Sequence, residues 1–386
     1  MSALIEGLFN GISIGSVLLI ASLGLAIVFG LMGVINLAHG ELMMLGAYTT
    51  FVVQNIFKSL GDPWFDFYII FSIPAAFVVA AIMGLILEKG VIRFLYGRPL
   101  ETLLATWGVS LILRQFVRSA NWLLIICIGV FCLLFFGGMT ALSRRSNWER
   151  IRNSVIAILL PISAGISVVT GFLIGKNAVL TKAWFSARNV DVTAPVWLRG
   201  GVKVLNFQMP YARLFIIALT IICLVGVYWF LNRSTWGLKI RSVTQNREMS
   251  SCLGIPTAKV DALTFALGSG LAGVAGCAVS LLGSVGPNTG QNYIVDTFMV
   301  VVVGGVGNLL GSVIAAFGIG IINYLIGSGT LALMFSSSDF FKPLVDILLF
   351  FATSSMAKVM VFGLIISFLQ IKPAGLFPPK GRTAEL

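Results

Sequence analysis

Apolar runs of 18 or more residues recur along this 386-residue chain, and runs of that length are the signature of α-helices that cross a membrane. Hydrophobic residues make up 58% of the sequence and charged residues only 10%, whereas soluble domains carry about 25% charged residues. The sequence therefore predicts an all-α, polytopic helical membrane protein with about eleven transmembrane spans. The expected spans are 4–31, 42–57, 67–87, 101–119, 121–142, 154–175, 211–231, 261–283, 294–309, 311–327 and 343–369.

The basic residues between these spans predict the orientation of the chain. In membrane proteins Lys and Arg gather in cytoplasmic loops, so we interpret the net charge of +12 as a topology signal and expect no nucleic-acid partner. Alternate connections carry 15 basic residues in one set and two in the other. We therefore expect the N-terminus outside the membrane and the C-terminus in the cytoplasm. The basic set is 88–100, 143–153, 232–260 and 371–386, and the other set is 58–66, 284–293 and 328–342.

A polar island, Asn36-Leu37-Ala38-His39-Gly40-Glu41, separates two apolar runs and contains the only histidine of the chain. A charge near the centre of a membrane costs roughly 2.5–3.5 kcal/mol on insertion scales, so this segment is expected to bind, pass or hold something polar. His39 fits either a packed, hydrogen-bonded residue at a helix break or a direct contact with a solute. Glu41 has the same two interpretations, and its position after Gly40 also suits a helix N-terminus, where a carboxylate is stabilised.

A hydroxyl stripe is expected on the span 101–119. Thr102, Thr106 and Ser110 are spaced four residues apart, which places them on one face of a helix. Each hydroxyl alone could bond back to its own backbone, but as a stripe beside the polar island they are candidates to line a path. Donors and acceptors with little fixed charge suit a small neutral or zwitterionic solute better than an ion.

The inner segment 232–260 is the longest polar connection on the expected cytoplasmic side. Residues Gly237–Leu253 lack internal Gly and Pro and predict a helix. Gly254 suits the position just after that helix, and Pro256 can open the next one. We expect a helix, a tight turn and a helix that enters the span at 261. The alternative is a plain amphipathic surface loop. A polar segment of this length need not form helices unless a partner packs on it.

The outer connection 176–210 predicts a small periplasmic hairpin. Short β-type runs, Val190–Val192, Val196–Leu198 and Val202–Leu205, surround the pair Gly200-Gly201, which is a hairpin pattern. Five basic residues lie in this connection, and long translocated loops obey the charge rule less strictly.

A weak internal echo suggests two repeated halves. Gly33–Leu37 resembles Gly305–Leu309, and Gly46 and Gly318 fall at the same offset. Repeated halves with broken helices commonly surround a transport site, which makes Asn308 a candidate path residue beside Asn36. Chance matching of Gly and Leu is the alternative.

No catalytic or metal-binding constellation is recognisable in the sequence. A single histidine argues against multi-histidine metal sites, and the five cysteines include no CxxC pair. The stretch nearest to a P-loop, Gly171–Asn177, has the wrong spacing and no Ser or Thr after its lysine. We therefore expect no enzyme activity, no metal and no cofactor on this chain, and ATP could be used only on another subunit.

Four separated motifs resemble the branched-chain amino acid and amide group of ABC-importer permeases. Within that group, Gln245–Pro256, Ser280–Asp296 and Ser354–Pro379 are most similar to the urea-importer permease of the cyanobacterial type. The resemblance covers about 1–120 and 184–386, and the departing residues 121–183 look like an inserted pair of spans. The four motifs are Asn36–Leu42, Thr102–Ser110, Arg241–Pro256 and Val302–Gly311.

The resemblance implies a single transmembrane domain, 1–386, in a bacterial inner (plasma) membrane. It implies a substrate path that includes the polar island and a coupling segment, 232–260, that docks on a nucleotide-binding subunit. The implied partners are a second homologous permease, two ATP-binding subunits carrying ATP and Mg, a periplasmic solute-binding protein, a small-molecule substrate and membrane lipid. The implied coupling residues are Arg241, Asn246, Arg247, Glu248, Gly254 and Pro256.

These observations favour the permease subunit of an ATP-driven importer for urea or a related small amide. A branched-chain amino acid importer is the alternative within the class. The rival class is an ion-coupled carrier or channel in which Glu41 and His39 relay protons. A relay usually needs several buried ionisable groups in series, and Asp346 and Lys358 lie too far apart to pair on one helix.

Overall fold

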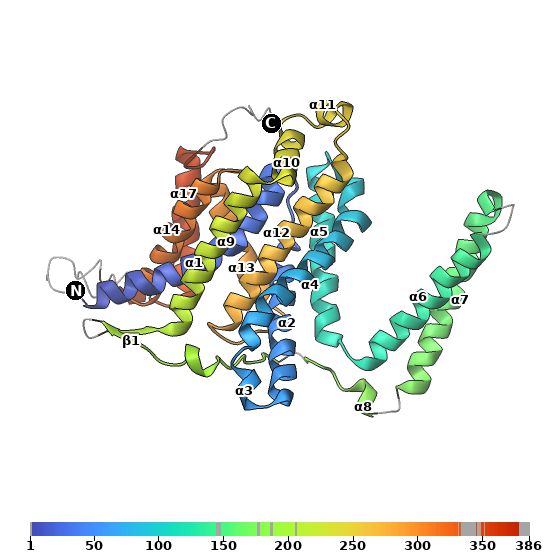
Figure 1. Ribbon diagram of the computed structural model, residues 1–386, viewed down its shortest axis with the longest axis horizontal. Helices are drawn as coiled ribbons and strands as arrows, with labels where there is room; N and C mark the ends of the chain where they lie inside the picture. Colours follow the sequence, from blue (N-terminus) through green and yellow to red (C-terminus); the bar gives the residue numbers. More distant parts are fainter. Residues whose placement is uncertain are drawn as a thin grey trace. The chain divides into compact units, whose positions relative to one another are not determined.

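The computed structural model describes residues 2–143, 148–175, 178–185, 188–204, 207–330, 332, 345, 349–350 and 352–377. Helices dominate these residues (Figure 1). The long helices of the first half are α1 (Ser2–Met32), α2 (His39–Leu60), α4 (Tyr68–Gly90), α5 (Pro99–Ser119), α6 (Trp122–Ser143) and α7 (Trp148–Ile174). The second half contains α9 (Tyr211–Arg233), α10 (Thr235–Gln245), α11 (Arg247–Cys252), α12 (Thr257–Ser280), α13 (Thr289–Gly304), α14 (Leu309–Gly327) and α17 (Ser354–Ile371). Short turns of helix are α3 (Asp62–Phe65), α8 (Ala178–Thr181), η1 (Ile92–Leu95) and η2 (Val196–Leu198).

The helical membrane class predicted from the sequence is confirmed. Within the described residues, seven helices are long and apolar enough to cross a membrane: α1, α4, α6, α7, α9, α12 and α14. Four further expected spans overlap α2, α5, α13 and α17. The expected span 294–309 was wrong at its end, because α13 stops at Gly304 and Gly305 has φ +100°. The last expected span starts at 343, and part of its first half lies outside the described residues. Eleven membrane crossings therefore remain a prediction.

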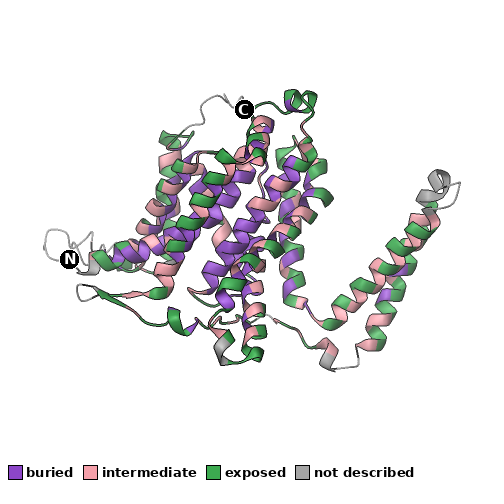
Figure 2. Cartoon of the chain, in the orientation of Figure 1, coloured by how far each residue is buried: buried purple, intermediate pink, exposed green. Residues whose placement is uncertain are grey.

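Helices α1 and α12 form the centre of the main bundle. In the most apolar 18-residue stretch of each of these two helices, 83% of the residues are buried, against 22% in α9. Figure 2 shows both helices as largely buried. They meet backbone to backbone, because a Cβ on Gly268 would lie 2.6 Å from the Gly24 carbonyl oxygen. Small residues permit such close approach between membrane helices. The glycine-rich composition therefore serves packing at this contact.

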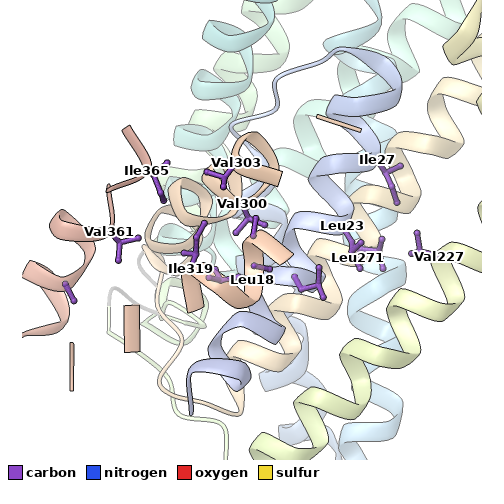
Figure 3. Packing of buried hydrophobic residues seen from close by; sticks show 14 of the residues in the cluster. Leu18, Leu23, Ile27, Val227, Leu271, Val300, Val303, Ile319, Val361 and Ile365 are labelled. Carbon is purple, nitrogen blue, oxygen red and sulfur yellow. The ribbon is translucent and has the colours of Figure 1, made fainter. Parts of the chain in front are cut away.

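A cluster of buried hydrophobic side chains from α1, α12 and neighbouring helices packs at this centre. Figure 3 shows its side chains interdigitating from several helices that are distant in sequence. Among them are Leu18 and Leu23 of α1, Leu271 of α12 and Val300 of α13. Burying each such side chain contributes about 1.5–3 kcal/mol.

The chain divides into two compact units, Met1–Leu111 with Val190–Leu386, and Ile112–Asn189. In the smaller unit α6 and α7 pack on each other, and Ser167 Oγ donates to the Cys127 carbonyl oxygen at 2.6 Å. The expected inserted pair, 121–183, falls inside this unit. Its interpretation as an insertion remains a prediction, and 144–147 of its basic connection lie outside the described residues.

The expected hairpin is present, with different strands. Strand β1 (Gly201–Val204) pairs antiparallel with β2 (Phe207–Pro210). Gly200, with φ +92°, precedes the first strand, so the glycine pair does not form the hairpin turn. The expected β-run Val196–Leu198 is a 3₁₀ turn, and Val190 instead bridges to Val285.

Gly46 and Gly318, which occupy matching positions in the possible internal repeat, should respond in opposite ways to substitution by alanine. A Cβ on Gly46 would lie 2.1 Å from the Gly273 carbonyl oxygen, whereas at Gly318 nothing lies within 4 Å. Gly46→Ala should lower the stability of the purified chain by about 1–3 kcal/mol through overpacking. Gly318→Ala should be neutral or slightly stabilising, because Ala favours a helix over Gly. Thermal unfolding in detergent measures both, and equal midpoints would contradict the α2–α12 contact.

Candidate substrate path and coupling segment

The polar island lies inside the bundle because the chain folds back after α1. Helix α1 ends at Met32, Gly33 has φ +67°, and α2 begins at His39. His39 Nε2 donates to the Ala21 carbonyl oxygen at 3.0 Å. Ala21 precedes Met32 by 11 residues, which is about 16 Å of helix. Residues 33–38 therefore run back along α1, and α2 starts at depth.

The island is almost fully buried. Asn36, His39 and Glu41 are 2%, 1% and 1% exposed. Asn36 Oδ1 accepts from the Ala38 N–H at 3.0 Å, which shapes the turn before α2. A Cβ on Gly40 would lie 2.4 Å from the Gly290 carbonyl oxygen at the start of α13. Glu41 lies in the first turn of α2, where the helix dipole stabilises a carboxylate.

The hydroxyl stripe of α5 reaches the island at two of its three positions. Thr106 Oγ1 accepts from the Leu37 N–H at 3.2 Å, and Ser110 Oγ donates to Glu41 Oε1 at 3.0 Å. Thr102 Oγ1 donates to the Arg98 carbonyl oxygen at 2.8 Å, in its own first turn. Thr106 and Ser110 thus support the folded-back segment, and Thr102 has the back-bonded role left open above.

Two polar atoms of the island have no hydrogen-bond partner within the described residues: Asn36 Nδ2 and His39 Nδ1. Because Nε2 donates its proton to a carbonyl oxygen, the neutral His39 ring presents Nδ1 as an acceptor. Burying such groups unpaired costs about 1–3 kcal/mol each. The island therefore retains one unpaired donor and one unpaired acceptor within the described residues.

The second copy of the possible repeat, Gly305–Leu309, makes a different turn. Helix α13 ends at Gly304, Gly305 has φ +100°, and Asn308 Oδ1 accepts from the Gly311 N–H at 3.2 Å as the N-cap of α14. Gly307 packs against Gly30 near the end of α1. Asn308 lines a groove of about 1080 Å³ together with Arg241. The two similar five-residue segments, 33–37 and 305–309, therefore take different paths: the first folds back along α1, and the second turns tightly.

The coupling segment contains two helices where the sequence predicted one. Asn246 Oδ1 accepts from the Met249 N–H at 3.0 Å and caps α11, so the helix breaks between Gln245 and Arg247. Asn side chains favour such caps over helix interiors. The expectation of a continuous helix over 237–253 was wrong at this residue.

The expected end of the segment is present. Gly254 has φ +79°, the Ile255 N–H donates to the Ser250 carbonyl oxygen at 3.0 Å, and the Gly254 N–H donates to that of Ser251 at 3.0 Å. This is the Schellman pattern, in which Gly supplies the left-handed residue after a helix. Pro256 then directly precedes α12.

The charged residues of the segment point in different directions. The Arg247 side chain pairs with the Asp261 carboxylate of α12, and its guanidinium lies 5.1 Å from the centroid of the Tyr96 ring. Arg241 NH1 donates to Asn232 Oδ1 at 3.4 Å. Glu248 is exposed.

Large apolar side chains also lie exposed on the segment. Met249 and Leu253 are 62% and 80% exposed at the end of α11, outside every expected span. These two side chains are candidates for contact with a partner.

Sequence reasoning missed the partners of Arg247. The Tyr96 hydroxyl donates to Glu88 Oε1 at 3.2 Å. Burial raises the pKa of the Tyr96 phenol, so the hydroxyl keeps the proton that it donates. Asp261 and Glu88 are acidic residues at the ends of apolar runs, which is the signal that could have identified them.

A second ion pair, with a buried carboxylate, also escaped the sequence analysis. Lys358 of α17 pairs with Asp296 of α13 at 2.9 Å, and its Nζ donates to the Asn292 carbonyl oxygen at 3.1 Å. The sequence analysis considers only Asp346 as a partner for Lys358, and Asp346 lies outside the described residues. The pairing neutralises a charge that is only 7% exposed.

A bundle of apolar helices with a broken helix and buried polar groups at depth is the architecture of a membrane transport protein. Within the described residues, no three His, Cys, Asp or Glu side chains gather as a possible metal site.

The chain belongs to the family described as "Branched-chain amino acid transport system / permease component", whose model matches residues 7–369. It is 24% identical to the BraD permease of Pseudomonas aeruginosa over 96% of this chain and 95% of the relative. It is 26% identical to LivH of Escherichia coli over 92% and 96%. The probable LivH of Methanocaldococcus jannaschii is 24% identical over 81% and 77%. No solved structure gave a significant match.

Family membership makes this chain a transport subunit of an ABC importer and a multi-pass membrane permease, and not an enzyme. The family-level expectation is thereby confirmed. The urea subtype is not confirmed, because the relatives named above are branched-chain amino acid permeases.

The support that Thr106 gives to the folded-back segment can be tested directly. Thr106→Val removes the acceptor of the half-buried Leu37 N–H and should cost about 1–3 kcal/mol. Thr106→Ser keeps the hydroxyl and is the matched control. Thermal unfolding and amide hydrogen exchange of residues 33–38 measure the effect. A valine variant with wild-type exchange would show that another group holds the segment.

Proposed function

We propose that this chain is the permease subunit of an importer that moves a branched-chain amino acid, driven by ATP hydrolysis on partner subunits. The family description and the names of the relatives support this substrate over urea. Urea remains the second candidate on the resemblance of Gln245–Pro256, Ser280–Asp296 and Ser354–Pro379 to urea-importer permeases.

The observation that carries the proposal is the pair of unsatisfied polar atoms in the buried island. Asn36 Nδ2 can donate to a carboxylate or carbonyl oxygen, and His39 Nδ1 can accept from an ammonium or amide N–H. Amino acids and amides both present this pair of groups. Glu41, Thr106 and Ser110 hold the site through the contacts described above.

The partner contacts are proposed from the coupling segment. Its exposed outer face, Glu248, Met249 and Leu253, docks on an ATP-binding subunit, and Asn246, Gly254 and Pro256 give that face its shape. A second permease, a second ATP-binding subunit and a periplasmic solute-binding protein complete the importer. The hairpin and the inserted pair are proposed as additions that leave the path intact.

Transport assays on the assembled importer test the substrate and the site together. We expect ATP-dependent uptake of leucine, isoleucine or valine into vesicles, and weaker or no uptake of urea. Asn36→Ser keeps an oxygen for the Ala38 N–H and removes Nδ2, so uptake should fall about three- to tenfold. Asn288→Ser, at an exposed position, is the control.

The same assay separates the rival functions. Urea uptake without branched-chain amino acid uptake would establish the second candidate. Uptake that follows external pH in the absence of ATP would replace the importer by an ion-coupled carrier.

The docking face is tested by one exposed residue. Leu253→Asp should remove apolar contact area and release the ATP-binding subunits during purification, while the chain remains folded and inserted. Leu253→Met keeps an apolar side chain and should retain them. Co-purification decides the outcome, and normal retention in the aspartate variant would place the docking face elsewhere.

A further inference from the structure

We propose that Arg247, Asp261, Tyr96 and Glu88 form a clamp that transmits movement of the coupling segment to α12 and α4. The inference rests on the function proposed above, in which that segment docks on an ATP-binding subunit. These four side chains then have a positioning role, and Arg247 contacts the bundle instead of the docked partner.

The clamp is a continuous series of contacts between three elements of the bundle. Arg247 begins α11 and pairs with the carboxylate of Asp261 in α12. Its guanidinium also lies over the Tyr96 ring, at 5.1 Å from the centroid. The Tyr96 hydroxyl donates to Glu88 in α4 at 3.2 Å. One arginine of the coupling segment thereby holds two helices of the bundle.

The burial of the Asp261 carboxylate makes the connection between α11 and α12 stiff. The Asp261 side chain is 4% exposed, whereas that of Arg247 is 48% exposed. A buried carboxylate that loses its partner becomes an uncompensated charge, which is strongly unfavourable. Helix α11 therefore cannot separate from the end of α12 at low cost, and the two move together.

Helix α12 extends from this clamp to the polar island. Seven residues after Asp261, Gly268 meets the backbone of α1 at Gly24, and a Cβ on Gly24 would lie 3.0 Å from the His39 ring. Further along, a Cβ on Gly276 would lie 1.9 Å from the Met43 carbonyl oxygen of α2. Close-packed backbones leave no flexible side chain to absorb a displacement. A shift at Arg247 thus reaches both helices that hold the island.

The decisive variant is Asp261→Asn in the assembled importer. It removes the charge without changing side-chain size, and the half-exposed Arg247 can be solvated, so the fold should persist. We expect the ATP-binding subunits to co-purify and to hydrolyse ATP at the basal rate. The amount of solute moved per ATP should fall roughly fivefold or more, the range of typical coupling between sites.

Two further variants distinguish a clamp from four separate contacts. Tyr96→Phe keeps the ring beneath Arg247 and removes the bond to Glu88, so solute moved per ATP should fall less than in Asp261→Asn. The loss in the double variant Arg247→Gln with Asp261→Asn should be smaller than the sum of the losses in the two single variants, because paired residues are not additive. Arg98→Gln breaks the exposed Arg98–Glu101 ion pair of 3.2 Å and is the matched control, with no expected change.

A second measurement needs no transport. Amide hydrogen exchange of residues 247–252 in the purified chain should speed up in Asp261→Asn and stay unchanged in Arg98→Gln. Unchanged exchange, or unchanged solute per ATP, would overturn the clamp. Loss of the ATP-binding subunits from Asp261→Asn would overturn it too, by making the pair part of the docking face. If the wild-type importer moves no solute with ATP, the proposed function fails, and exchange still decides the clamp.

Discussion

The need to satisfy backbone hydrogen bonds within an apolar bundle governs the candidate site. Residues 33–38 leave helical geometry beside the buried core of α1, where an unpaired backbone group costs several kcal/mol. Side chains satisfy two of these backbone groups: Thr106 Oγ1 accepts from the Leu37 N–H, and Asn36 Oδ1 accepts from the Ala38 N–H. His39 then fixes the start of α2 against the Ala21 carbonyl oxygen. The polar island therefore interrupts the helix and also contains the two buried polar atoms, Asn36 Nδ2 and His39 Nδ1, on which the proposed solute contact rests.

The central packing makes the same region responsive to the far end of α12. Gly24 and Gly268 remove the side chains that would separate α1 from α12, and Gly276 does so for α12 and α2. Small residues at membrane helix interfaces replace the hydrophobic driving force that lipid does not supply. Such contacts do not tolerate an added Cβ. In the proposed clamp they make α1, α2 and α12 move as one body.

The proposed clamp and the proposed docking face lie on two surfaces of the segment 232–260 that differ in chemistry. Inward lies a charged pair, Arg247 with Asp261, and outward lie Met249 and Leu253. The resemblance in sequence implied the same coupling role for Arg247 and Glu248. Only the break at Asn246 and the direction of α11 separate them.

The sequence by itself determined the helical membrane class, the places of the helices and the Gly254 turn, because long apolar runs and glycine conformations are local properties. It also identified Asn36, His39, Glu41, Thr106 and Ser110 as candidates, since polar residues in apolar surroundings are unusual. It could not show that the chain folds back after Met32, that Asn308 caps a helix, or that Asp261 faces Arg247. These depend on contacts between residues distant in sequence, and only the tertiary structure decides which polar groups find a partner there.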